Sequence, residues 1–145
     1  MIGERRARIP SMTQFYDLDA ANAAVPELDR IMTALGDQRA ELIRLRDEVL
    51  TRGGGSEGTS TAVGGDLRVT RLRMQGLIDQ MAAGVARIDG LGLTLRDIEH
   101  GLVDFPALVA GRQVWLCWQR GEPAIGFWHD LDTGFSGRRP LAELA

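Results

Sequence analysis

A heptad stripe that follows Pro26 constrains the fold of this chain more than any other feature. Residues there recur at alternating spacings of three and four, the pattern of a helix that buries one seam against a partner helix. The stripe consists of Leu28, Ile31, Leu35, Gln38, Leu42, Leu45 and Val49, and Gln38 is its one polar member. The pattern predicts a helix over residues 17–52, with Asp17 as its N-cap and a kink or break at Pro26.

A second segment, residues 66–89, carries a similar stripe and supplies the partner helix. Its apolar positions are Leu67, Met74, Leu77, Met81 and Ile88, widened by Ile78 and Val85. Asp66 is the expected cap and Gly90 the expected stop. Six of the thirteen residues between the segments (53–65) are glycine, which predicts a mobile loop. Residues 13–90 are therefore expected to form an antiparallel helical hairpin.

The composition changes after residue 100, where six of the eight aromatic residues lie. "LTLRDI" (93–98) alternates like a strand, and the extended piece before Pro106 is expected to stop there. "QVWLCWQ" (113–119) and "AIGFWHD" (124–130) are expected to pair as a hairpin through "RGEP". Residues 91–145 thus form a small β unit. The predicted fold is α+β, a long antiparallel helical hairpin packed as one domain with an antiparallel sheet of about three strands.

Composition excludes several classes of function. All 17 basic residues are arginine, so lysine Schiff-base chemistry and a Walker-type phosphate loop are excluded. The net charge of −3 argues against nucleic-acid binding as the main function. No apolar run is long enough to span a membrane. One cysteine allows no internal disulfide, and we expect a cytoplasmic location. Residues 1–12 are expected to be a flexible tail, with Met12 as an alternative start.

Chemistry-bearing side chains concentrate around the predicted hairpin. Asp104, Cys117, Glu122 and His129 are the candidate ligands of a divalent metal, although their spacing matches no recognised metal motif. The alternative is structural, with Cys117 as a small core residue and His129 bonded to backbone. In one register Cys117 lies opposite Gly126 and His129 is on the other face. In another it lies opposite Ile125 and shares a face with His129.

Three C-terminal motifs and one helix start carry a family resemblance. They are "GLVDFPAL" (101–108), "LCWQRGEP" (116–123), "FWHDLDTGFSGRRPL" (127–141) and "YDLDAANAAVPEL" (16–28). Together they resemble an uncharacterised bacterial family, domain of unknown function 2203, from about residue 13 onward. The family implies no activity, substrate or cofactor. The resemblance implies that the four candidate ligands, with Gly137 and Arg138, belong to the recurring pattern of the family.

These observations leave two principal expectations about function. The first is a small non-catalytic interaction or oligomerisation protein that forms a homodimer through the helical hairpin, because its stripe exceeds what one partner helix covers. The second is a metal- or small-ligand-binding protein that uses the C-terminal β-hairpin, and this alternative includes an enzyme. Arg138 is its expected ligand-binding residue. A weaker third expectation is nucleic-acid contact through Arg138, Arg139 and the tryptophans.

Overall fold

The structure is a computed structural model that describes residues 14–54 and 61–144. In these residues two long helices precede a five-stranded antiparallel sheet, so the fold is α+β, with five strands where about three were predicted. The helices are α2 (Leu18–Gly54) and α3 (Thr61–Gly90). The strands are β1 (Thr94–Asp97), β2 (Leu102–Val109), β3 (Arg112–Gln119), β4 (Phe127–His129) and β5 (Arg139–Pro140). Two short 3-10 turns, η2 (Phe135–Gly137) and η3 (Leu141–Glu143), flank β5.

The start of α2 confirms the predicted cap. Asp17 Oδ1 accepts a hydrogen bond from the N–H of Ala20 at 2.7 Å, which satisfies one of the unpaired donors of the first turn. The helix continues through Pro26 as one element, so a break there was wrong. Proline removes the N–H that would bond to the carbonyl of Asn22. Burial of Val25 and Leu28 on either side of it in the core offsets this loss.

The connection between the helices is shorter than the sequence indicated. Helix α2 reaches Gly54 and α3 begins at Thr61, so both ends of the predicted loop 53–65 are helical. Asp66 consequently lies inside α3 and does not cap it. Once the hairpin is formed, each added residue gains a backbone hydrogen bond, and this offsets the weak propensity of the glycines. Residues 55–60 and the predicted tail 1–12 lie outside the described residues.

The end of α3 is set by Gly92, two residues beyond the predicted stop at Gly90. Gly92 has a φ of 78°, the left-handed conformation that glycine adopts without a steric penalty. Its N–H bonds to the carbonyl of Asp89, and the N–H of Leu93 bonds to the carbonyl of Ile88. These two bonds are a Schellman motif. Ile88 and Leu93 are both buried, so the motif turns the chain directly into the core.

The strands are arranged in chain order, each antiparallel to the next. Strand β2 passes through Pro106, where the sequence indicated a stop. The carbonyl of Pro106 accepts the N–H of Tyr16, so this residue turns its polar groups away from β3. Because N–H and C=O of a strand residue point to the same side, the missing N–H removes no bond from the ladder between β2 and β3.

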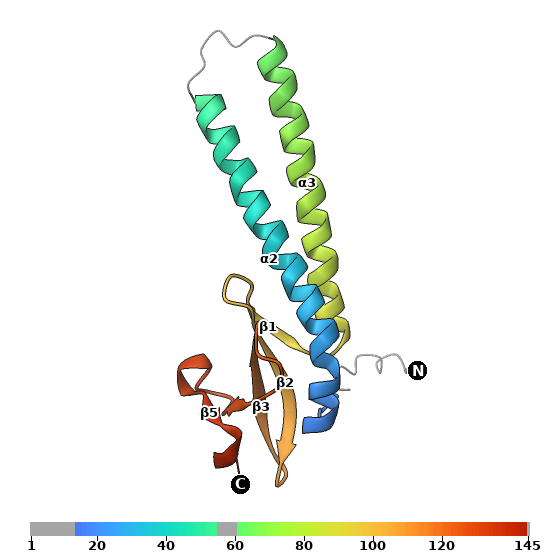
Figure 1. Cartoon of the computed structure of the whole chain (residues 1–145), viewed down its shortest axis with the longest axis vertical. Coiled ribbons are helices and arrows are strands. Elements are labelled where there is room, and N and C mark those ends of the chain that lie inside the picture. The colour runs from blue at the N-terminus through green and yellow to red at the C-terminus, as the bar shows by residue number, and fades with distance from the viewer. Residues whose placement is uncertain (1–13, 55–60, 145) are drawn as a thin grey trace, which may run out of the picture.

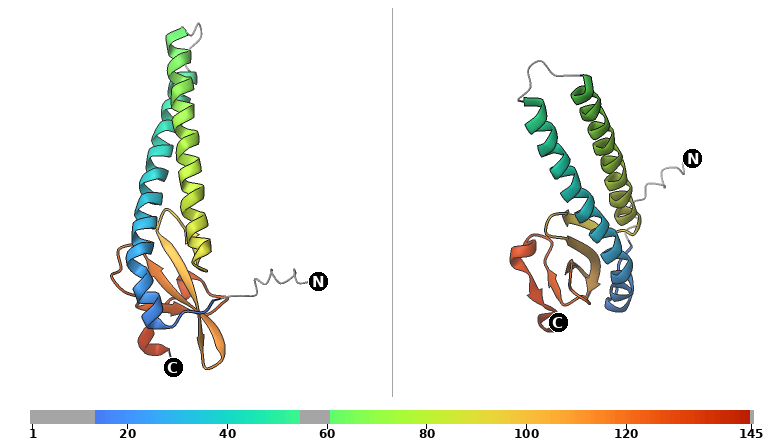
Figure 2. Two further views of the ribbon diagram at one scale, coloured as in Figure 1. Left: turned by 90° about the vertical axis from the view of Figure 1, so that its right-hand side faces the viewer. Right: turned by 45° about the horizontal axis from the view of Figure 1, so that its top comes forward.

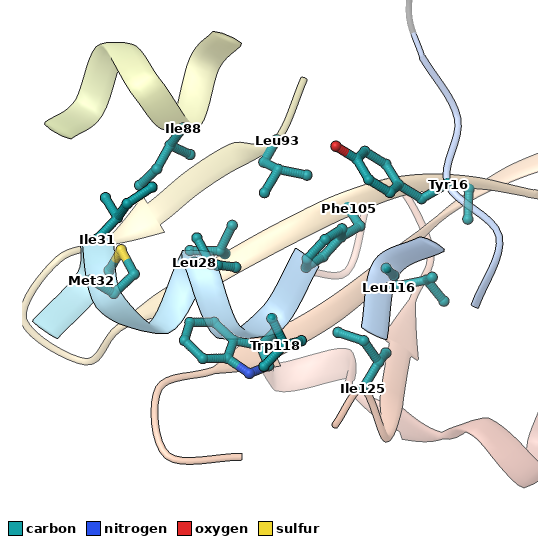
Figure 3. Close-up of a cluster of buried hydrophobic side chains, with 14 of the residues drawn as sticks. Tyr16, Leu28, Ile31, Met32, Ile88, Leu93, Phe105, Leu116, Trp118 and Ile125 are labelled. Atoms are coloured by element: carbon teal, nitrogen blue, oxygen red, sulfur yellow. The ribbon is translucent and has the colours of Figure 1, made fainter. Parts of the chain in front are cut away.

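One face of the sheet packs against α2 and forms the core. It presents alternate residues of β2, β3 and β4, namely Val103, Phe105, Ala107, Val114, Leu116, Trp118 and Trp128, all buried. Figure 3 shows Phe105 and Trp118 close to Leu28 of α2, with Leu116 further along the same cluster, near Ile125.

Only part of the hairpin covers the sheet. Figure 1 shows the first half of α2 against the sheet, while the rest of α2 and the start of α3 project beyond it. The η2 turn that precedes β5 lies on the side of the sheet opposite the helices, as the right-hand view in Figure 2 also shows, whereas Leu141 and Leu144 after β5 pack against the core. None of the helical residues described here offers a stretch long and apolar enough to cross a bilayer.

Candidate functional site

Three of the four predicted metal ligands meet on the sheet face that is turned away from the helices. Asp104 on β2 pairs with Cys117 on β3, and His129 on β4 pairs with Trp115 of the same middle strand. All three candidate side chains are buried, and one potential ligand atom from each lies within 4.8 Å of the others. The pleat therefore places a carboxylate, a thiol and an imidazole together.

The register between β3 and β4 differs from both registers considered from the sequence. Cys117 lies opposite Phe127, because the connection is not a tight turn at residues 120–123 but extends from Arg120 to Gly126. Phe127 and Ile125 are two residues apart, so this register places the side chains of β4 on the same faces as the pairing of Cys117 with Ile125 would. Cys117 and His129 therefore share a face, together with Trp115 and Phe127.

The hydrogen bonds of His129 orient its imidazole ring. Nδ1 lies 2.8 Å from the backbone carbonyl of Asp130, which only accepts, so Nδ1 carries a proton and donates it. Nε2 lies 2.9 Å from Oδ2 of Asp104. In the neutral ring Nε2 has a lone pair that faces the carboxylate, so the contact is favourable only when a proton or another cation lies there. Metal-binding histidines in proteins are commonly oriented by the same kind of bond from the other ring nitrogen.

The carboxylate of Asp104 is satisfied on one oxygen only. Oδ2 accepts a hydrogen bond from Nε of Arg96 at 2.7 Å in addition to its contact with His129. Oδ1 is buried and has no hydrogen-bond partner among the described residues. A buried carboxylate oxygen without a partner raises the free energy of the folded state. A cation or a water molecule bound to Oδ1 would remove this cost.

Burial raises the pKa of the Cys117 thiol to about 11, because the thiolate would lose its solvation. The guanidinium of Arg138 acts in the opposite direction and lowers that pKa by a smaller amount. At neutral pH the free side chain is therefore a protonated thiol, which is a poor nucleophile. A bound metal ion replaces such a proton, since metal binding takes up the thiolate form.

Glu122 pairs with Arg138 and does not join the three donors, although Arg138 Nη2 also lies 3.4 Å from the backbone carbonyl of Cys117. Arg138 Nη2 lies 2.6 Å from Oε1 and 2.8 Å from Oε2 of Glu122. Oε1 also accepts the N–H of Gln119, and the guanidinium packs over the rings of Phe127 and Phe135. This contact attaches the C-terminal segment to the sheet. Both residues were candidates for ligand binding, and the structure engages them with each other.

A small cavity of about 80 Å³ adjoins the three donors. Besides Asp104, Cys117 and His129 it is lined by Arg96, Leu102, Gly134 and Phe135. Arg96 was not singled out from the sequence. The strand alternation in "LTLRDI" carried no reliable signal for it, because the register shifts between Leu95 and Asp97, where Arg96 lies.

The residues of the weaker nucleic-acid expectation are largely engaged. Trp118 and Trp128 are buried, and Trp118 Nε1 donates to the carbonyl of Glu122. Arg139 is exposed and packs over Trp128. With Arg138 bound to Glu122, no aromatic surface with free arginines is assembled from these residues in the described part of the chain.

The fold and this cluster define the molecule as an α+β protein with a helical hairpin and a buried Asp–Cys–His group on its sheet. The sequence model of the family described as "Uncharacterized conserved protein (DUF2203)" matches residues 14–141. The chain belongs to this family, as its motifs indicated. No curated protein and no solved structure matches it.

Proposed function

We propose that the protein binds a divalent transition metal ion, most suitably Zn²⁺, through Asp104, Cys117 and His129. The observation that carries this proposal is the convergence of three different donor types within 4.8 Å in a buried position. Thiolate, imidazole and carboxylate are the donors that zinc sites use. The unpartnered Oδ1 of Asp104 supports the proposal, because this buried oxygen has no hydrogen-bond donor among the described residues.

The dimensions of the cluster fit a tetrahedral ion. Zinc–ligand bonds of about 2.0–2.3 Å imply separations of roughly 3.3–3.6 Å between neighbouring ligand atoms. The contact of 2.9 Å between Nε2 of His129 and Oδ2 of Asp104 is slightly shorter than this. Entry of the ion therefore requires these two side chains to separate, and any ligand atoms near the outer limit of 4.8 Å to approach one another.

The nearby cation Arg96 opposes metal binding, and its effect has to be weighed. Its guanidinium bonds to Asp104, and its side chain is 43% exposed, so solvent screens its charge. Arg138 is neutralised by Glu122. The carboxylate and the thiolate together balance a divalent ion, and a single screened arginine does not reverse that attraction.

The experiment is a titration of the metal-free protein with Co²⁺, which reports ligands through its visible and near-ultraviolet absorption. Because Cys117 is the one cysteine of the chain, a thiolate-to-cobalt charge-transfer band identifies the site. We expect one equivalent to bind, and Zn²⁺ to displace it. Cys117→Ser should lose the band, and His129→Gln should weaken binding by at least tenfold.

His100→Gln is the matched control, because His100 is the other histidine of the chain and is exposed. It should bind cobalt like the wild type. Wild-type protein that shows no thiolate band at stoichiometric cobalt would overturn the proposal, provided that its melting curve shows a folded chain.

We infer a second function, self-association through the hairpin, from a different observation. Among the described helical residues five large apolar side chains are exposed, and the most exposed are Leu50 at 64% on α2 and Leu72 at 67% on α3, with Val69 at 55% one turn before Leu72. In a helix that needs one partner only, such residues are polar. A second copy of the hairpin offers a surface of the same kind, which is why we favour a homodimer over an unrelated partner.

A further inference from the structure

The lining of the cavity beside the three donors suggests what the site holds besides a metal. Three protein ligands leave one position of a tetrahedral ion free, an arrangement typical of sites that exchange a ligand, whereas structural zinc sites use four. Glu122 does not supply the fourth ligand, because both of its oxygens are bound to Arg138. The described residues place no other carboxylate, thiol or imidazole in the cluster.

The space at that position is real but small. A cavity of about 80 Å³ exceeds several times the ~10–15 Å³ that one water molecule requires. It therefore accommodates an ion with a ligand of a few non-hydrogen atoms. Leu102 and Phe135 give part of it an apolar lining, which fits a short hydrocarbon substituent.

The charges in the cluster indicate the net charge of the additional ligand. The carboxylate of Asp104 and the thiolate of Cys117 neutralise a divalent ion, and the ring of His129 is neutral when it binds metal. Arg96 then remains as one uncompensated positive charge on the cavity wall. A monoanion restores neutrality, whereas a doubly charged phosphate leaves an excess of negative charge.

Arg96 is held in place at the cavity wall. Its Nε is bound to Asp104, and its guanidinium lies 4.9 Å from the ring centroid of Trp115. A guanidinium binds carboxylates and phosphates alike, so the charge and the size of the cavity, and not its shape, favour a small monocarboxylate.

We propose that the metal site binds a small monocarboxylate, with one carboxylate oxygen on the ion and the anion paired to Arg96. This inference rests on the proposed metal binding and names the class of ligand that it serves. Arg96 is a ligand-binding residue in this scheme, and its removal leaves the three metal donors in place.

The test uses the full-length protein loaded with Co²⁺ and titrated with sodium acetate at constant ionic strength, with perchlorate as the balancing salt. We expect a saturable change in the visible cobalt spectrum of the wild type. Arg96→Gln should still bind cobalt, because it removes a cation that opposes the ion, and measured against its own acetate-free spectrum it should bind acetate about tenfold or more weakly, because a charge-assisted hydrogen bond is lost. Arg139→Gln, which removes an exposed arginine outside the cavity, should behave like the wild type.

The outcomes separate the two proposals. Cobalt binding without any response to acetate would overturn the carboxylate proposal and leave the metal site intact. An acetate response that is the same in wild type and Arg96→Gln would also overturn it, because the guanidinium would then have no part in binding. Failure of cobalt to bind at all would overturn both.

Discussion

The imidazole of His129 reaches across the whole width of β3 to the carboxylate of Asp104, and Nε2 and Oδ2 lie 2.9 Å apart. The two residues are on strands that do not pair with each other. Cys117 of the intervening strand completes the group, so three neighbouring strands each contribute one donor. A site assembled in this way depends on the sheet, which in turn depends on its packing against α2.

Metal binding should stabilise the fold. An ion that binds only the folded chain adds about 2.7 kcal/mol to the unfolding free energy when its free concentration is about 100 times its Kd. We expect this increase in urea denaturation of the wild type with Zn²⁺ relative to the same protein with a chelator. Cys117→Ala should show little response to zinc. An equal response in that variant would mean that zinc binds elsewhere.

Trp118→Ala should unfold the domain more readily than any change on the opposite sheet face. Trp118 is fully buried against α2, so its truncation leaves a large cavity and costs about 3–5 kcal/mol. Trp115 is only partly buried and lies on the other face, so Trp115→Ala should cost clearly less. Denaturant unfolding of both variants compares them, and similar losses would contradict the assignment of the core to one face.

Much of the fold was predictable because its signals are local. Helical spacing identified both helices, and the side chain of Asp17 identified one cap. The end of α3 was misplaced because Gly90 and Gly92 are equivalent in sequence, and only the packing of Leu93 against Ile88 selects the second. Strand β5 has just two residues, which is too short for any alternating pattern.

The candidate site was predictable in its residue types but not in its geometry. Asp104, Cys117 and His129 were selected because few other side chains near the hairpin carry metal chemistry. Whether these side chains meet depends on the register of β4 against β3. That register is set by the length of the connection between the two strands, and not by the three residues themselves. The pairing of Glu122 with Arg138 joins residues sixteen apart, and no sequence pattern announces it.

Two glycines of α3 should respond oppositely to alanine. At Gly76 nothing lies within 4 Å of an added Cβ, so Gly76→Ala should stabilise the protein by about 0.5–1 kcal/mol through helix propensity. At Gly84 the new Cβ would lie 3.0 Å from Leu35 Cδ2, and Leu35 is buried. Gly84→Ala should therefore destabilise by about 1 kcal/mol, since overpacking exceeds the gain in propensity. Thermal unfolding of the two variants side by side checks this.

The exposed pair of Asp97 and His100 should respond to pH. A hydrogen bond to His100 lowers the pKa of Asp97, and the same contact raises the pKa of His100 above its ordinary value of 6.5. The contribution of Asp97 to stability is lost as the pH falls through the lowered pKa of this carboxyl group. The histidine contribution is present below 6.5 and is lost as the pH rises through the raised pKa. The pair therefore stabilises the turn most between about pH 4 and pH 6.5.

An NMR titration of the His100 ring measures this effect directly. Asp97→Asn should bring the pKa of His100 down toward 6.5, because the largest cause of its increase is the Asp97 side chain. Glu99→Gln, which removes a weaker Coulombic contribution, should lower it less. An equal decrease in the two variants would show that general charge, not the hydrogen bond, sets the pKa.

Self-association should depend on the exposed apolar residues of the hairpin and not on its buried stripe. Leu35 is already buried inside one chain, so a charge there would unfold the monomer and reveal nothing about a dimer. Val69 and Leu72 are more than half exposed, and Val69→Glu with Leu72→Glu should convert a dimer to a monomer while the fold is retained. Ala82→Glu adds a charge of the same sign at an exposed position of α3 and serves as the control. Light scattering at micromolar concentration gives the mass of each variant. A monomeric wild type would refute self-association through this surface, and a dimer that survives the double substitution would place the interface elsewhere.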